Sequence, residues 1–235
     1  MFGSPVDLSV RHFRPEWMDD AGLDVAEHRR ALAGLARINR ISGVAGRMWG
    51  QIRPFAMRRP GLRVLDLACG GGDVAIAIKR LAERAGLKVT VHGCDVSEVA
   101  LDHARQQAGA DEVVLFRLNA LRDVLPADYD VLVSCLFLHH LDLGDVVALL
   151  RRMARCARQC VLVSDLHRSV LGLLAAWAGT RLLSRSRVVH HDGAASVRAA
   201  FTIGEMTQMA HEAGLRNARL RATWPWRWLL RWDRP

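Results

Sequence analysis

Short apolar runs alternate along the middle of this chain with segments whose apolar residues recur at helical spacing. The runs with the composition of buried strands are 63–68, 88–94, 112–118, 129–136 and 159–165. The segments with helical spacing between them are 73–85, 97–108 and 142–157. Strands that alternate with helices predict a parallel sheet with helices on both faces. Ligands bind such sheets at the C-terminal ends of the strands, so the residues that end these runs are the first candidates for a site.

The flanking regions add helices before the sheet and an insertion near its end. Residues 1–22 contain the breakers Pro5, Pro15 and Gly22, and helices are predicted from Asp24 to about Ile41 and from Val44 to Phe55. The later elements are an apolar helix at 170–183, a polar His-rich stretch at 184–200, a helix at 205–213 and an antiparallel strand pair at 216–223 and 226–232. The predicted fold class is α/β. It has a doubly wound, mostly parallel seven-stranded sheet, N-terminal helices and a helical insertion after the fifth strand.

The first strand ends in a carboxylate and a glycine-rich loop, in the run VLDLACGGGD that begins at Val64. Glycine permits the tight turn and close backbone approach to a ligand, and the helix behind it opens with free N–H groups. Gly70-x-Gly72-x-x-Ala75 fits the dinucleotide pattern. However, Asp66 lies beneath the loop, where it would repel a pyrophosphate and attract the ammonium and sulfonium of S-adenosylmethionine.

The same run fits the pattern D/E-x-G-x-G-x-G, with Ala68 in place of the first glycine. Here the chain resembles the class I S-adenosylmethionine-dependent methyltransferases, whose domain has a Rossmann-like fold. The resemblance implies S-adenosyl-L-methionine as the cofactor, with S-adenosyl-L-homocysteine as product, held by Asp66, Ala68, Gly70 and Gly72. Dinucleotide binding and a purely structural turn are the alternatives.

The resemblance extends to the ends of the next strands. The second strand ends at Asp95-Val96, about 25 residues after the glycines, where the family has an acid that accepts hydrogen bonds from the ribose hydroxyls. The alternative is a helix cap, a role that Ser97 fills better. The third strand ends at Asn119-Ala120, where the family usually has Asp to accept from the adenine amino group.

The side-chain carbonyl of Asn119 can still accept that hydrogen bond, and a surface turn is the alternative. Cys135, at the end of the fourth strand, completes the expected cofactor set.

Two adjacent histidines, His139 and His140, follow the fourth strand. Methyl transfer is an in-line displacement in which the protein aligns, desolvates and deprotonates the acceptor. A histidine with the ordinary pKa of about 6.5 can take a proton from a phenol or enol. His139 is therefore the predicted catalytic residue and His140 a predicted substrate contact. The alternative is a structural pair that caps the helix at 142–157.

Other segments resemble a subgroup of small-molecule methyltransferases that bacteria often encode beside type III polyketide synthases, in secondary metabolism. They are Trp17-Met18-Asp19-Asp20, Arg37-Ile38-Asn39-Arg40, Ser164–Ser169 and Val189–Arg198. The resemblance implies that His167, His191 and Arg198 contact the acceptor, with surface or loop-anchoring roles as the alternative. It also implies a helical cap at 1–60, a methyltransferase domain at 61–235 and a substrate-covering insertion at 166–213.

Composition and charge narrow the partners. The net charge of +9 comes from arginines spread through the chain, without an aromatic-interleaved basic tract, and the fourth strand lacks both an Asn/Asp-Pro-Pro-aromatic tetrad and a Pro-Cys pair. Nucleic acid is therefore not an expected partner. The apolar helix and Trp224, Trp226, Trp228 and Trp232 could form a membrane anchor, but a sheet face is the favoured interpretation. Membrane contact is not expected, and the sequence indicates no oligomeric state.

The five cysteines lack metal-site spacing, no run is long enough to span a bilayer and the N-terminus lacks a signal pattern, so the expected location is the cytoplasm. No Asp/Glu/His cluster with ligand spacing lies at the strand ends, so no metal is expected. The predicted function is methyl transfer to a small hydrophobic, aromatic or polyketide-like acceptor, most directly at a hydroxyl oxygen. The alternatives are C-methylation of a lipid-quinone ring and a non-catalytic, cofactor-binding partner subunit.

Overall fold

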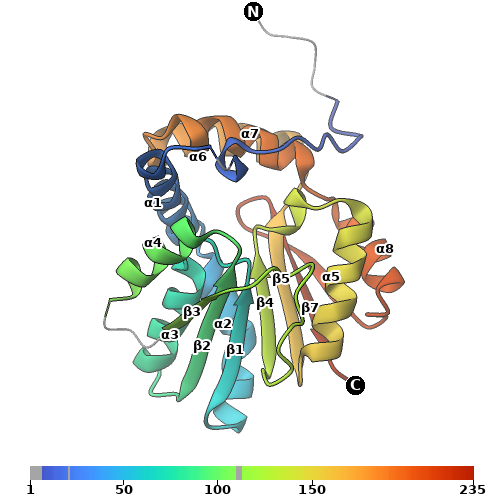
Figure 1. Cartoon of the computed structure of the whole chain (residues 1–235). Coiled ribbons are helices and arrows are strands. Elements are labelled where there is room, and N and C mark those ends of the chain that lie inside the picture. Colours follow the sequence, from blue (N-terminus) through green and yellow to red (C-terminus); the bar gives the residue numbers. More distant parts are fainter. Residues whose placement is uncertain (1–6, 21, 110–112) are drawn as a thin grey trace, which may run out of the picture.

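The chain forms a seven-stranded sheet in the order β3-β2-β1-β4-β5-β7-β6 (Figure 1). The computed structural model describes residues 7–20, 22–109 and 113–235. Its strands are β1 (Leu62–Leu67), β2 (Val89–Asp95), β3 (Val113–Arg117), β4 (Val131–Cys135), β5 (Cys160–Leu166), β6 (Arg219–Thr223) and β7 (Arg227–Asp233). The first five are parallel, and β7 pairs antiparallel with β5 and β6. The predicted fold class is confirmed; position 112 of the predicted third strand, and residues 1–6, lie outside the described residues.

The helices are η1 (Trp17–Asp19), α1 (Val25–Ser42), α2 (Val44–Arg58), α3 (Asp73–Arg84), α4 (Glu98–Ala108), η2 (Leu138–His140), α5 (Leu143–Cys156), α6 (Val170–Leu183), α7 (Arg187–Ala199) and α8 (Ile203–Glu212). Successive strand residues face opposite sides of the sheet, and both sides are buried. On one side Val64 and Val133 pack with α2 and α3, and on the other Leu65 and Leu132 pack with α5 and α8. Among the described helices, none combines the length and apolar character needed to cross a bilayer.

A third group of helices lies beyond the sheet rather than on its faces. Figure 1 shows α6 and α7 across the top of the view, joined by α1, with the sheet below them. The segment before α1 runs along α7, because the Asp192 carboxylate of α7 accepts hydrogen bonds from the backbone N–H groups of Trp17 and Met18 at 2.9 and 3.0 Å. Of the two N-terminal helices, only α1 joins this group, because α2 packs in the sheet layer.

Most of residues 184–200, described above only as polar and His-rich, form helix α7. Its buried side includes Val188, Val189 and Val197, so the helical spacing is present. Gly193 in its middle is typical of a loop, but here it permits close packing on α6. A Cβ at Gly193 would lie 2.5 Å from Cγ2 of Thr180. The other predicted helices and strands are present, with ends shifted by a few residues.

The tryptophans near the C-terminus divide between two environments. Trp228 and Trp232 are buried on β7, which agrees with the interpretation as a sheet face. Trp224 is 68% exposed in the β6–β7 turn. Helix α6 also has a buried and an exposed side. Gly172 and Thr180 are buried, whereas Leu174 and Trp177 are more than half exposed.

Candidate active site

The glycine-rich loop between β1 and α3 has the backbone conformation that its sequence requires. Ala68, Gly70 and Gly72 have φ values of 55°, 51° and 73°. A Cβ at Gly70 would meet nothing within 4 Å, so the loop borders open space there. A Cβ at Gly72 would lie 2.8 Å from Cβ of Ala104, so this glycine is needed where the loop packs on α4. Gly70 faces the cavity described below, and Gly72 does not line it.

Asp95, the last residue of β2, holds the loop in place. Its carboxylate accepts hydrogen bonds from the backbone N–H groups of Gly70 at 2.8 Å and of Ser97 at 2.9 Å. Ser97 in turn caps α4 by accepting from the N–H of Ala100. A carboxylate has about four lone-pair positions, so Asp95 can accept further hydrogen bonds from a ligand.

Asp66 lies near the end of β1 and is 1% exposed. Its Oδ1 has no hydrogen-bond partner among the described residues. Burial raises the pKa of Asp66 well above its ordinary value, and the nearby carboxyl groups of Asp73 and Asp95 raise it further. A buried, unpaired carboxylate is costly, so this position favours a cationic ligand.

A cavity of about 980 Å³ opens at the C-terminal ends of the parallel strands. The predicted residues that line it are Asp66, Ala68, Gly70, Asp95, Val96, Asn119, Ala120, Cys135, His139 and His140. Its remaining wall is largely apolar and comes from α1 and α6, including Leu35, Ile38, Ala175, Ala176 and Leu183. The cavity therefore joins the glycine-rich loop to the two histidines.

His139 lies between two carboxylates at the end of this cavity. Its Nδ1 is 2.7 Å from Oδ1 of Asp165 on β5, and its Nε2 is 3.5 Å from Oε1 of Glu16. Burial by itself would lower the pKa of His139, but Asp165 and then Glu16 raise it to about 10. Burial would raise the pKa of Glu16, but His139 and His140 lower it to about 2. Both ring nitrogens of His139 thus face carboxylates, which is not the arrangement of a free base.

His140 has a similar arrangement with a more open position. Its Nδ1 is 3.0 Å from Oδ2 of Asp19, and its Nε2 is 3.8 Å from Oε2 of Glu16. The Ser196 hydroxyl of α7 donates a hydrogen bond to Glu16. Glu16, His139 and His140, called the acceptor cluster below, therefore combine a residue of the N-terminal segment with two from the end of β4. No sequence pattern indicated this cluster, because Glu16 lies more than a hundred residues before His139 and His140.

The comparisons with known proteins agree with this geometry. The chain is 31% identical over 210 residues to a ubiquinone biosynthesis O-methyltransferase of Thiobacillus denitrificans, a match that covers 79% of this chain and 84% of the relative. The chain belongs to the class I S-adenosylmethionine-dependent methyltransferases. Residues 64–159 match the family described as "Methyltransferase domain". A 2-phytyl-1,4-naphtoquinone methyltransferase of Synechococcus elongatus is 36% identical over 138 residues, 54% of this chain and 56% of the relative.

Solved structures show the same fold. A magnesium protoporphyrin IX methyltransferase from Synechocystis PCC 6803 aligns with a TM-score of 0.57 at 16% identity, over 92% of this chain and 90% of the other. The plantazolicin methyltransferase BpumL aligns with a TM-score of 0.64 at 14% identity, over 89% and 96%. Both structures contain S-adenosylhomocysteine. Because the chain belongs to the S-adenosylmethionine-dependent methyltransferases, S-adenosylmethionine is its cofactor.

Arg227 is a cavity residue of the methyltransferase that the sequence analysis missed. It begins β7, opposite Leu166 at the end of β5, and is 3% exposed. One nitrogen donates to Oδ1 of Asn39 at 3.0 Å, whereas Nε and Nη1 have no partner among the described residues. Burial lowers the pKa of Arg227 to about 10. The sequence pattern indicated only a strand residue here, because the partner strand that places it at the cavity is distant in sequence.

The expected adenine contact differs in detail from the sequence prediction. Oδ1 of Asn119 accepts hydrogen bonds from the N–H groups of Leu121 and Arg122 at 2.9 and 3.1 Å. The carbonyl oxygen that was expected to accept from adenine is thus engaged by the turn. Its Nδ2 remains as a donor toward a ligand.

Three predicted acceptor contacts do not line the cavity. His167 forms an isolated backbone β-bridge with Phe201, and burial lowers the pKa of the His167 imidazole. His191 stacks on Trp17 with ring centroids 3.9 Å apart and contacts Asp192. The backbone carbonyl of Arg198 accepts from His12, and its Nε is buried without a partner in the described structure. His191 and Arg198 thus contact the N-terminal segment that carries Glu16, whereas His167 contacts Phe201.

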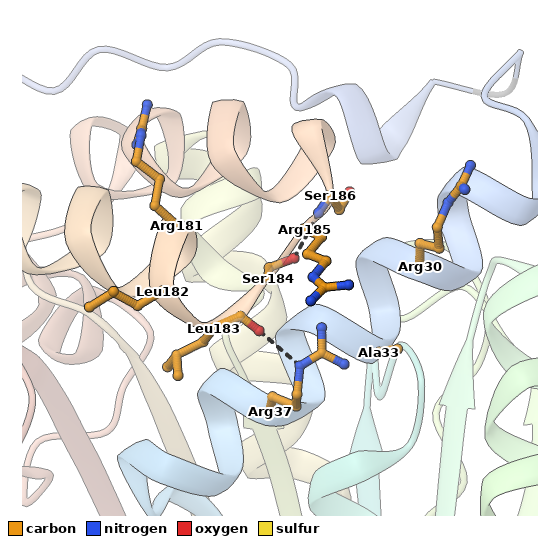
Figure 2. Close-up of a pocket in the computed structure, with 9 residues that line it drawn as sticks. All are labelled: Arg30, Ala33, Arg37, Arg181, Leu182, Leu183, Ser184, Arg185 and Ser186. Atoms are coloured by element: carbon orange, nitrogen blue, oxygen red, sulfur yellow. Dashed lines mark hydrogen bonds between the residues drawn. The ribbon is translucent and has the colours of Figure 1, made fainter.

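A separate hollow of about 700 Å³ lies on the outer side of α1. Figure 2 shows it between Arg30 and Arg37 on α1 and the connection from Arg181 to Ser186. Nε of Arg37 donates to the carbonyl of Leu183 at 2.8 Å, and Arg30 pairs with Glu27. Leu183 also borders the main cavity. The hydrogen bond from Arg37 therefore connects the end of α6 to α1 beside this hollow.

Proposed function

We propose that this methyltransferase transfers a methyl group to a hydroxyl oxygen of a small hydrophobic acceptor of aromatic or polyketide-like type. The observation that carries the proposal is the single cavity with two chemically different ends. One end has the glycine-rich loop with Asp66 and Asp95, and the other has the acceptor cluster. The apolar wall between them suits a flat, poorly hydrated molecule.

The cofactor end offers a group for each polar part of S-adenosylmethionine. In this proposal the unpaired carboxylate of Asp66 binds the ammonium group, and the unpaired nitrogens of Arg227 bind the carboxylate. Asp95 accepts hydrogen bonds from the ribose hydroxyls while it holds the glycine-rich loop. The adenine ring and the methyl-bearing end of the cofactor are bordered by Val96, Asn119, Ala120 and Cys135. The bound cofactor supplies a methyl carbon on a positively charged sulfur, which is a good leaving group.

The acceptor end must orient a hydroxyl group and remove its proton. The cluster is the polar part of this end, and it lies where β4 and β5 finish. His139 is the base expected from the sequence, and its contacts with Asp165 and Glu16 lead us to propose an orienting role for it instead. We assign the activation of the hydroxyl group to the acceptor cluster as a unit. Of the segments expected to cover the acceptor, 1–60 and 166–213, the parts that we assign to this role are the segment that carries Glu16 and helices α1, α6 and α7, which supply the apolar wall.

The relatives favour a quinol-like or phenolic acceptor. One carries the name of an O-methyltransferase of ubiquinone biosynthesis, and the other is named a naphthoquinone methyltransferase. The second name keeps C-methylation of a lipid-quinone ring as the alternative function.

The deciding experiment uses S-adenosylmethionine with a deuterated methyl group and a panel of polyhydroxy aromatic and quinol acceptors. NMR of the product distinguishes an O-methyl from a C-methyl group. We expect an aryl methyl ether, and the same acceptors with every hydroxyl blocked should not react. A ring C-methyl product would replace the proposal by its alternative. Binding of S-adenosylhomocysteine without transfer to any hydroxylated acceptor would refute it.

A further inference from the structure

The three side chains of the acceptor cluster converge on one point. One atom from each of Glu16, His139 and His140 lies within 4.8 Å of the other two. The three residues come from the N-terminal segment and from η2, and all three line the main cavity. A point surrounded by two imidazole nitrogens and a carboxylate oxygen has the ligands that first-row divalent cations prefer.

The outer contacts of both histidines also fit cation ligation. Nδ1 of His139 contacts Asp165, and Nδ1 of His140 contacts Asp19, at 2.7 and 3.0 Å. A carboxylate on Nδ1 fixes the ring and leaves Nε2 directed at the common point. This pairing of carboxylate and histidine is the usual outer support of a histidine that ligates a metal. Two adjacent histidines with this same support are hard to explain as helix caps.

The contacts between the histidines and the carboxylate of the cluster are longer than those of good hydrogen bonds, and each histidine faces a different oxygen of Glu16. The contacts from Nε2 of His139 and His140 to the Glu16 carboxylate are 3.5 and 3.8 Å. Both are too long for good hydrogen bonds. Two ligand atoms about 2.0–2.1 Å from one tetrahedral zinc ion lie about 3.3 Å apart. A small inward movement of the three side chains would therefore complete the coordination. The carboxylates of Glu16, Asp19 and Asp165 would be balanced by the charge of the cation.

We propose that Glu16, His139 and His140 bind a divalent cation of the zinc type, whose open coordination position receives the acceptor's hydroxyl oxygen. This inference rests on the proposed function of the same cavity. Two imidazoles favour Zn²⁺ over Mg²⁺, which prefers oxygen ligands. Three protein ligands with one open position are typical of catalytic rather than structural zinc.

The cation would remove the need for a strong protein base. The acceptor's oxygen binds the cation, which lowers the pKa of the hydroxyl, and the proton leaves to solvent water. A lone pair of that oxygen then forms the new bond to the methyl carbon, and the electron pair of the carbon–sulfur bond goes to sulfur. The cation is not consumed, and no oxidant or reductant is needed.

The binding test uses the full chain, stripped with a chelator and titrated with Zn²⁺ or Co²⁺ alone. We expect one ion per chain and a Co²⁺ spectrum without a thiolate charge-transfer band. Asp19→Asn should weaken binding by about 10–100-fold, as expected for an outer partner. Glu16→Gln and His140→Gln should weaken it more, and His211→Gln, at an exposed position of α8, should not change it. S-Adenosylhomocysteine affinity serves as the folding control. Unchanged Zn²⁺ affinity in folded Glu16→Gln and His140→Gln would overturn the proposal.

The activity test separates this inference from the proposed function. Chelated protein should methylate a phenolic acceptor at least tenfold more slowly, with recovery by Zn²⁺ but not by Mg²⁺. An undiminished rate in metal-free protein overturns the role of the cation and leaves O-methylation intact. One Zn²⁺ bound through these ligands, with methylation only at a ring carbon, supports the site and overturns the proposed function.

Discussion

The two ends of the cavity are built in opposite ways. At the cofactor end, backbone turns and strand ends place the groups: Asp66 and Asp95 end adjacent parallel strands, and Asp95 holds a loop only 25 residues before it. At the acceptor end, side chains link distant segments, with Glu16 held by Ser196 from 180 residues away. The positions of Asp66 and Asp95 at the cofactor end therefore depend on the sheet, whereas the position of Glu16 at the acceptor end depends on a few long-range hydrogen bonds. Substitutions should therefore separate binding from turnover.

The largest expected effect is at the cofactor end. Asp95→Ala removes the proposed ribose acceptor and both hydrogen bonds that hold Gly70 and Ser97. Two charge-assisted hydrogen bonds to the ribose, worth about 1.5–3 kcal/mol each, correspond to a loss of about 10²–10⁴-fold in affinity. Calorimetry with S-adenosylhomocysteine measures it, with Asp102→Ala on the exposed side of α4 as the control. Wild-type affinity in a folded Asp95→Ala protein would remove Asp95 from the cofactor site.

The second effect should appear in turnover and not in cofactor affinity. Asp192→Asn replaces the carboxylate that accepts hydrogen bonds from the N–H groups of Trp17 and Met18. The segment that carries Glu16 is then held less firmly, so we expect Glu16 to be misplaced. Misplacement of about 1 Å can cost about 10²-fold in rate. We expect kcat to fall toward that extent while S-adenosylhomocysteine binds normally. Arg187→Gln is the matched control, because Arg187 is exposed on the same helix and does not line the cavity. Equal losses in kcat and in cofactor affinity would contradict the separation of the two ends.

The same difference explains how far the sequence could predict the fold. Strand runs such as 63–68 and 159–165 are visible because their burial pattern is local, and the helix at 170–183 has the predicted bounds. Helix α7 was missed because Gly193 and its histidines are typical of a loop. Gly193 instead permits the close packing of α7 on α6, which only the tertiary structure shows.

Within the candidate site, the residues with a local sequence signal could be predicted, whereas those held by distant partners could not. Asp66, Gly70 and Asp95 could be found because one motif and one strand end contain them. Glu16 and Arg227 carry no local signal, since each reaches the cavity through a partner more than a hundred residues away. His139 and His140 were found, but the carboxylates that decide their chemistry were not. Which of these residues act in catalysis stays a prediction until the variants are measured.

The third test asks whether Arg227 belongs to the cofactor end. Arg227→Met keeps an unbranched apolar stem but removes the guanidinium group that we assign to the cofactor carboxylate, together with its hydrogen bond to Asn39. One charge-assisted hydrogen bond is worth about 1.5–3 kcal/mol, so affinity for S-adenosylhomocysteine should fall by about 10–150-fold. 5′-Methylthioadenosine lacks the amino-acid part, and both proteins should bind it equally. An equal loss for both ligands would mean that Arg227 acts through folding of the cavity.

The smallest effect is a pH dependence that belongs to Asp66. Burial, then Asp73 and Asp95, raise the pKa of Asp66 in the ligand-free protein. A bound ammonium group would favour the charged carboxylate and lower that pKa, so binding releases a proton. Affinity for S-adenosylhomocysteine should therefore fall as the pH drops through the raised pKa, by at most about tenfold per pH unit. Calorimetry in two buffers with different ionisation enthalpies, at a series of pH values above the ordinary pKa of a carboxyl group, would count the released protons. Asp66→Asn should abolish the slope, and 5′-methylthioadenosine should show none with the wild-type protein. If the slope persists in Asp66→Asn, another buried group carries the proton and the ammonium is bound elsewhere.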